Sequence, residues 1–182
     1  MKIIPTKIPD LKILEPSVFA DDRGYFFESY SYQKLKDLGI DKQFVQDNES
    51  KSQKGVLRGL HFQNPPFAQA KLVRVVRGAV LDVAVDIRKN SPTYGQHVCV
   101  ELSEQNKRMF YIPEGFAHGF LVLENDTIFS YKCSQFYNKE SEGALLWNDE
   151  TLAIDWGFEN PILSEKDKIA PSFSNFQSQF FN

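Results

Sequence analysis

The 182-residue sequence is poor in cysteine and lacks any long apolar run. Its two cysteines, Cys99 and Cys133, belong to no Cys-x-x-Cys pair, which argues against a disulfide framework and against a cysteine zinc site. No segment reaches the roughly 20 apolar residues that cross a bilayer, and the N-terminal residues lack the apolar core of a signal peptide. We therefore expect a soluble protein in a reducing compartment, the cytoplasm.

An excess of charge of either sign is also missing. The chain has 21 lysines and arginines against 24 aspartates and glutamates, a net charge of −3. Domains that follow a phosphate backbone are usually basic, so we expect no nucleic-acid partner. What the chain does have is 42% hydrophobic residues, including 16 phenylalanines, enough for one domain over residues 1–182 with its own core.

Turn-forming residues recur along the chain and separate short runs rich in Val, Ile, Phe and Tyr, a pattern typical of strands. In the clearest run, 78–87, successive residues alternate between two faces of a strand: one face is apolar, and the other includes Asp82 and Asp86. The expected strands are 25–30, 55–63, 71–76, 78–87, 97–102, 108–112, 119–123 and 127–134. Eight or more strands predict an all-β fold, either a sandwich or a jelly-roll barrel.

Helical patterns are few. One short helix is expected over 31–38, with Ser31 as its N-cap and Gly39 as its stop. After Pro171, phenylalanines stand three and four residues apart, which fits either a docked terminal helix or a frayed tail. We therefore expect a β-rich domain with a few short helices and a short C-terminal tail.

The chain has only three histidines, His61, His97 and His118. His61 shares an apolar run with Arg58, and on a regular strand these two side chains would face opposite sides. A bulge at Gly59 would bring both inward. A structural role for His61 stays open on the sequence alone, and His97 is interpreted as a surface or core residue.

His118 ends the segment Pro113-Glu114-Gly115-Phe116-Ala117-His118, which resembles the second motif of the cupin superfamily. Metal-binding cupins pair this motif with an earlier His-x-His followed by Glu, because a divalent ion needs three or four ligands. Here Gln63 stands in place of the second histidine, and Phe67 and Ala68 stand where the Glu would be. The resemblance implies a jelly-roll fold, whereas the missing ligands argue against a metal.

Four further side chains have both a structural and a functional reading. Tyr131 lies in an expected strand and could simply fill space. Tyr137 could pack in a loop or offer its ring to a flat ligand. Lys71 begins a strand, where lysines are usually solvated, and Asp167 stands at the third position of a helix start capped by Ser164.

Seven blocks together resemble the dTDP-4-dehydrorhamnose 3,5-epimerase family of nucleotide-sugar epimerases, from about residue 2 to residue 171. They are ILEP at 13–16, DRGYFFESY at 22–30, FVQDN at 44–48, LRGLHFQ at 57–63, IPEGFAHGF at 112–120, LWNDE at 146–150 and LSEKD at 163–167. The resemblance implies a metal-free cupin that needs no cofactor and acts as a homodimer on a dTDP-linked 4-keto-6-deoxy sugar.

The resemblance also implies site residues. His61 would be the base that removes protons next to the ketone, oriented by Asp167, while Tyr131 would return a proton on the other face and Lys71 would stabilise the enolate. The implied substrate-binding residues are Arg58 and His118 for the sugar, Arg23, Glu28, Gln46, Asn48, Glu142 and Lys166 for the nucleotide and pyrophosphate, and Phe26 and Tyr137 for the thymine or its sugar. Arg23 and Glu28 are candidates to serve the partner's site.

The expected chemistry suits these residue types. A histidine titrates near neutral pH, so it can act as a base, and inversion needs a separate donor on the opposite face because a returned proton regenerates the substrate. Three alternatives stay open: a mono-epimerase for a related nucleotide sugar, a non-catalytic sugar-nucleotide-binding cupin, and a metal-dependent cupin oxygenase or isomerase.

Overall fold

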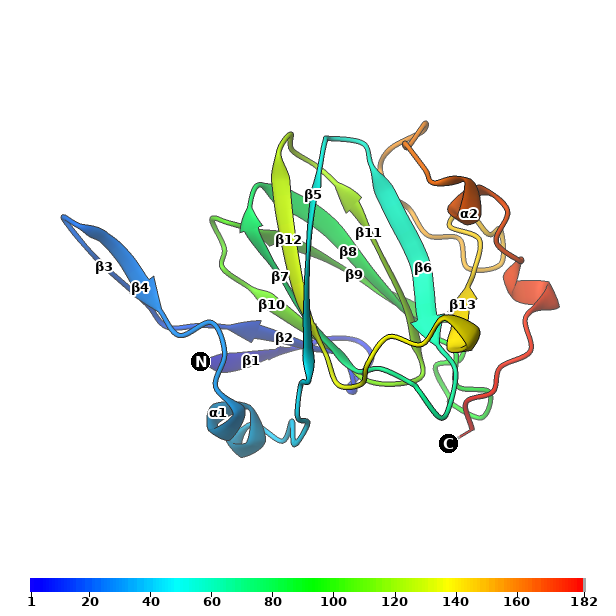
Figure 1. Ribbon diagram of the computed structural model, residues 1–182, viewed down its shortest axis with the longest axis horizontal. Coiled ribbons are helices and arrows are strands. Elements are labelled where there is room, and N and C mark those ends of the chain that lie inside the picture. Colours follow the sequence, from blue (N-terminus) through cyan, green and yellow to red (C-terminus); the bar gives the residue numbers. More distant parts are fainter. Residues whose placement is uncertain (182) are drawn as a thin grey trace.

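Two sheets packed face to face form the body of the computed structural model, which describes residues 1–181 (Figure 1). The six-stranded sheet has the order β1 (Lys2–Pro5), β2 (Lys12–Glu15), β10 (Met109–Ile112), β7 (Lys71–Arg77), β12 (Thr127–Cys133) and β5 (Gln46–Ser52). The five-stranded sheet has the order β13 (Glu142–Ala144), β6 (Leu57–Gln63), β11 (Phe116–Val122), β8 (Ala79–Asp86) and β9 (His97–Ser103). The predicted all-β jelly-roll fold is confirmed.

Helices are short and few, as expected. They are α1 (Tyr32–Asp37), α2 (Glu165–Lys168) and the 3₁₀ turns Lys139–Ser141 and Phe173–Asn175. The Ser31 side chain caps α1 by accepting a hydrogen bond from the Lys34 amide, as predicted. Among residues 1–181, no helix is long and apolar enough to span a membrane.

The main core lies between the sheets. Val73 and Phe129 from the six-stranded sheet contact Val80, Val100 and Phe120 from the five-stranded sheet, all of them buried. The alternation noted in 78–87 therefore places Asp82 and Asp86 on the side of β8 that faces this interior, and both are fully buried. The opposite side of β8 packs against the C-terminal segment.

The segment after Pro171 is docked, so the frayed-tail alternative is wrong. Phe173 and Phe176 pack on the outer face of the five-stranded sheet, and Phe180 is 8% exposed. The docked segment contains only one 3₁₀ turn instead of a terminal helix. It contacts the sheet directly behind His61, because the rings of Phe176 and Phe62 meet edge to face, 5.4 Å apart.

The eight predicted strands all exist, with shifted ends: the 25–30 prediction is too long, since β4 (Gly24–Phe27) ends at Phe27. Five strands were missed: β1, β2, β3 (Val18–Asp21), β5 and β13. β5 was missed because its sequence, QDNESKS, is wholly polar. β3 and β4 form a two-stranded hairpin that projects from the body (Figure 1).

Candidate active site

A cavity of ≈ 390 Å³ opens between the two sheets, and six of the predicted site residues line it. They come from four strands and from α2: Arg58 and His61 from β6, Lys71 from β7, His118 from β11, Tyr131 from β12, and Asp167 from α2. The β6 residues reach it together because the strand is irregular at Gly59. The register shifts between the pairs His118↔His61 and Phe120↔Arg58, as the bulge prediction requires.

Gly59 cannot carry a side chain in this conformation. Its φ is +130°, and a Cβ there would lie 2.5 Å from the Gly119 Cα. Glycine therefore permits the irregularity that turns Arg58 and His61 toward one cavity.

His61 is held by a carboxylate from the far end of the chain. Its Nε2 lies 2.5 Å from Asp167 Oδ1, and Asp167 is 2% exposed. Ser164 caps α2 by accepting a hydrogen bond from the Asp167 amide, so the capping prediction is confirmed. Asp167 is thus part of the helix cap and also faces His61. Burial acts to raise the pKa of Asp167, but hydrogen bonds from His61, Ser164 and the Gly59 backbone outweigh it and leave the pKa lowered. Asp167 is therefore ionised at neutral pH.

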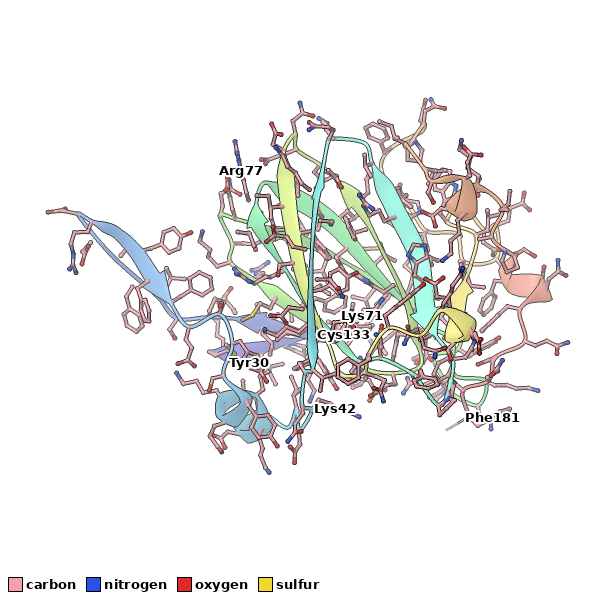
Figure 2. The ribbon with its side chains drawn as sticks, viewed as in Figure 1. Tyr30, Lys42, Lys71, Arg77, Cys133 and Phe181 are labelled. Carbon is pink, nitrogen blue, oxygen red and sulfur yellow. The ribbon has the colours of Figure 1, made fainter. Side chains whose placement is uncertain are left out.

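Tyr131 and Lys71 lie in the wall formed by β12 and β7. Burial raises the pKa of the Tyr131 phenol, partly offset by the positive charge of Arg58, so the phenol is protonated at neutral pH. Lys71 is partly buried, not solvated as strand-start lysines usually are, and burial lowers the pKa of its ammonium. Lys71 on β7 lies opposite Cys133 on the neighbouring strand β12, and Figure 2 labels the two next to each other.

Arg58 and His118 complete the cavity wall. Both Nε and a terminal nitrogen of Arg58 donate to Ser52 Oγ, at 3.4 and 3.1 Å, and these bonds hold the guanidinium against β5. His118 is 6% exposed, and its Nε2 lies 3.0 and 3.1 Å from the two carboxylate oxygens of Asp82.

A second cavity, ≈ 210 Å³, adjoins the first and shares His61, Lys71 and Tyr131 with it. Its other walls include four of the predicted nucleotide-side residues: Gln46, Asn48, Tyr137 and Glu142. The Tyr137 amide donates to Gln46 Oε1 at 3.0 Å, and the Tyr137 ring is left 56% exposed. Lys166 lies beside this group through its ion pair with Glu142, at 2.7 Å.

Three predicted substrate-binding residues lie elsewhere. Arg23 and Phe26 are on the β3–β4 hairpin and line neither cavity, and Phe26 is 71% exposed. Arg23 pairs with Asp21 on the hairpin, and Glu28 pairs with Lys34 of α1. Within one chain the structure does not bring these residues to the others.

Sequence reasoning missed several cavity residues. Ser50 was missed together with β5, although Gln46, Asn48, Ser50 and Ser52 alternate along it at the period of a strand. Asp82, which lies behind the cavity wall and contacts His118, was noticed only as part of an alternation, and its pairing with His118 could not be read from the chain. The apolar wall formed by Phe120, Ile162 and Leu163 carried no signal of its own.

Gln63, which stands where metal-binding cupins have their second histidine, is engaged in hydrogen bonds with the backbone. Gln63 donates its amide to the carbonyls of Phe67 and Phe136, at 2.6 and 3.2 Å. Over residues 1–181, no cluster of three or more His, Cys, Asp or Glu side chains is arranged to hold a metal ion.

Comparison with known proteins points to one family. Residues 5–175 match the family model described as dTDP-4-dehydrorhamnose 3,5-epimerase. The Salmonella typhimurium protein of that name is 58% identical over 173 residues, covering 94% of each chain. The crystal structure of the Elizabethkingia anophelis epimerase has a TM-score of 0.92 at 54% identity, covering 96% of this chain and 97% of that one.

A Legionella pneumophila epimerase solved in complex with dTDP-4-keto-L-rhamnose has a TM-score of 0.93 at 52% identity, covering 97% of this chain and 94% of that one. The chain belongs to the dTDP-4-dehydrorhamnose 3,5-epimerase family.

Proposed function

We propose that the chain inverts carbons 3 and 5 of dTDP-4-dehydro-6-deoxy-D-glucose to give dTDP-4-dehydro-L-rhamnose. The observation that carries this proposal is one cavity lined by a half-buried phenol, a half-buried lysine and a histidine that contacts a buried carboxylate. Membership of the family and the sugar nucleotide bound to the Legionella relative support the substrate.

His61 is the proposed base. The C–H bonds on either side of the ketone are acidic because the carbonyl takes up the charge, and an imidazole is well matched to this proton transfer near neutral pH. Asp167 accepts a hydrogen bond from Nε2, which fixes Nε2–H and leaves the other ring nitrogen, Nδ1, to take the proton. The ionised carboxylate then stabilises the imidazolium.

Tyr131 is the proposed acid on the opposite face. It is protonated at neutral pH, and the Arg58 charge stabilises the phenolate formed when it gives up its proton. Lys71 is the proposed electrostatic partner of the enolate oxygen, in the manner of an oxyanion hole.

The adjoining cavity is the proposed nucleotide site. Tyr137 offers an exposed ring for the thymine, and Gln46 and Asn48 supply amide groups. Lys166 supplies a cation for the pyrophosphate. A chain of net charge −3 can bind such an anion through a few placed cations.

We also propose a homodimer in which the β3–β4 hairpin of one subunit completes the nucleotide site of the other. The support is the hairpin's exposed aromatic surface, with Phe19, Tyr25 and Phe26 all more than half exposed, and the distance of Arg23 from its own cavity residues. The unpaired thiols of Cys99 and Cys133 support a cytoplasmic location, because a reducing compartment keeps thiols free.

Incubation with the sugar nucleotide in heavy water tests the reaction, with NMR reading carbons 3 and 5. We expect deuterium at both carbons for the wild type and at neither for His61→Asn. Tyr131→Phe should slow inversion while dTDP still binds. Exchange at one carbon would indicate a mono-epimerase and exchange at neither a binding protein, and full exchange in His61→Asn would remove its role as base.

A further inference from the structure

A second histidine–carboxylate pair stands beside the first. His118 on β11 is the cross-strand neighbour of His61 on β6, and Asp82 reaches His118 from β8 on the other side. Both Asp82 oxygens lie within 3.1 Å of His118 Nε2, and Asp82 is fully buried. A buried carboxylate costs free energy unless neighbouring groups stabilise its charge, and His118 is such a neighbour of Asp82.

We propose that Asp82 is a positioning residue for the reaction proposed above: it holds His118 as the Nε2–H tautomer and places its carboxylate near the ammonium of Lys71. The inference rests on the proposed function, because it assigns Asp82 a task toward two groups of that site.

The tautomer follows from the geometry. An ionised carboxylate can only accept, so Nε2 must carry the hydrogen and Nδ1 is left with a lone pair. Burial lowers the pKa of His118, and the charges of Lys71 and His61 lower it further, against the opposing effect of Asp82. His118 is therefore neutral at neutral pH, and its Nδ1 offers a hydrogen-bond acceptor.

Several charged groups of this cavity cannot accept a hydrogen bond from a ligand. Arg58 and Lys71 can only donate, and Asp167 already accepts from His61. A sugar hydroxyl, which must donate its hydrogen to something, can find that acceptor in His118.

Several titratable side chains surround Lys71. Lys71 shares its two cavities with Arg58 and His61 from β6, His118 from β11, Tyr131 from β12, Glu142 from β13 and Asp167 from α2; Cys133 is its cross-strand partner, and Asp82 from β8 lies behind His118. Glu142 is paired with Lys166, and Asp167 with His61. Burial raises the pKa of the Cys133 thiol, so it is uncharged at neutral pH. Asp82 is the carboxylate left to stabilise the ammonium.

The test is Asp82→Asn, which keeps the shape and removes the charge. We expect kcat to fall by about tenfold to a hundredfold, as when a reacting group is slightly misplaced. Because a nearby negative charge raises the pKa of a lysine, its removal lowers that pKa, and the alkaline limb of the kcat profile should move to lower pH by about one unit. The affinity for dTDP should not change.

Asp86→Asn is the matched control. Asp86 lies on the same side of the same strand, is also fully buried and, like Asp82, lines neither cavity, but it pairs with Arg88 instead of with a histidine of the site. This variant should lose stability and keep the wild-type pH profile. An Asp82→Asn protein with the wild-type kcat and pH limbs would overturn the proposal.

Ring ¹⁵N NMR of the wild type provides a second test should Asp82→Asn fail to fold. The three histidines can be assigned with a His97→Gln spectrum and a His61→Gln spectrum. We expect His118 as the neutral Nε2–H tautomer at pH 7, and a protonated ring or the Nδ1–H tautomer would overturn the proposal. Absence of epimerase activity in the wild type would instead count against the proposed function, whatever tautomer is found.

Discussion

The two histidines proposed to act in the site are paired with partners distant in the chain. His61 and Asp167 are 106 positions apart, and His118 and Asp82 are 36 apart. In both His61 and His118, one ring nitrogen is hydrogen-bonded to a buried carboxylate, which fixes the tautomer of the ring before substrate binds. Local chemistry thus depends on long-range contacts.

Asp167→Asn should lower kcat by about 10²–10⁴-fold, because the imidazolium formed at His61 loses its countercharge. The measurement is kcat and KM for the sugar nucleotide, and KM should change much less than kcat.

Asp149→Asn is the control for burial alone. Asp149 is 6% exposed and accepts hydrogen bonds from the Leu152 and Phe173 amides, remote from both cavities. Its substitution should lower stability without lowering kcat. If both variants lose kcat equally, the loss comes from destabilisation, and the orienting role of Asp167 is wrong.

Among the elements, β5 and the C-terminal segment show how the site is supported. β5 carries polar residues on its inward side because that side faces the cavities, whereas the inward residues of β7 and β12 farther inside are apolar. The C-terminal segment covers the outer face of β6, on which His61 lies, with Phe176 and Phe180 against Phe62.

Phe180→Ala should lower the free energy of unfolding by about 3 kcal/mol, because removing a buried ring leaves a cavity. Denaturant unfolding measures this.

Phe181→Ala is the adjacent control. Phe181 is 66% exposed, and its side chain is labelled at the surface in Figure 2, so the change should stay within about 0.5 kcal/mol. Equal effects at both positions would mean that the segment is not docked in solution.

At the scale of the whole molecule, one chain brings the residues proposed for the sugar to one cavity but only part of the residues proposed for the nucleotide to the adjoining one. The hairpin that bears Arg23 and Phe26 extends from the body (Figure 1), and its aromatic side chains are exposed. Exposed apolar surface of this kind marks an interaction site, and a two-fold dimer would bury it twice.

A heterodimer of two inactive variants tests the exchange of hairpins. Arg23→Ala and His61→Asn chains, co-expressed with different tags and purified as a pair, should form one intact site out of two and recover about half of the wild-type activity. If Arg23 serves its own chain, both sites stay impaired and no activity returns. A monomer in sedimentation would contradict the homodimer itself.

Strand positions could be predicted from the sequence where strands were apolar, and side-chain alternation could be predicted in β8. β5 could not, because a strand that lines a polar cavity lacks the apolar signal by which strands are recognised. The bulge at Gly59 was predictable as a hypothesis, since glycine between two inward-facing candidates permits it.

The sequence by itself determined the fold class, the family and the identity of the candidate reactive side chains, because these depend on local pattern and residue type. The family resemblance already implied that Asp167 orients His61 and that Arg23 serves a partner subunit. Only the tertiary structure decided that Asp167 contacts His61 at 2.5 Å while its amide is capped by Ser164, that Asp82 faces inward to His118, and that Arg23 lines neither cavity. Those facts depend on which distant segments meet when the sheets pack, and no local pattern encodes that.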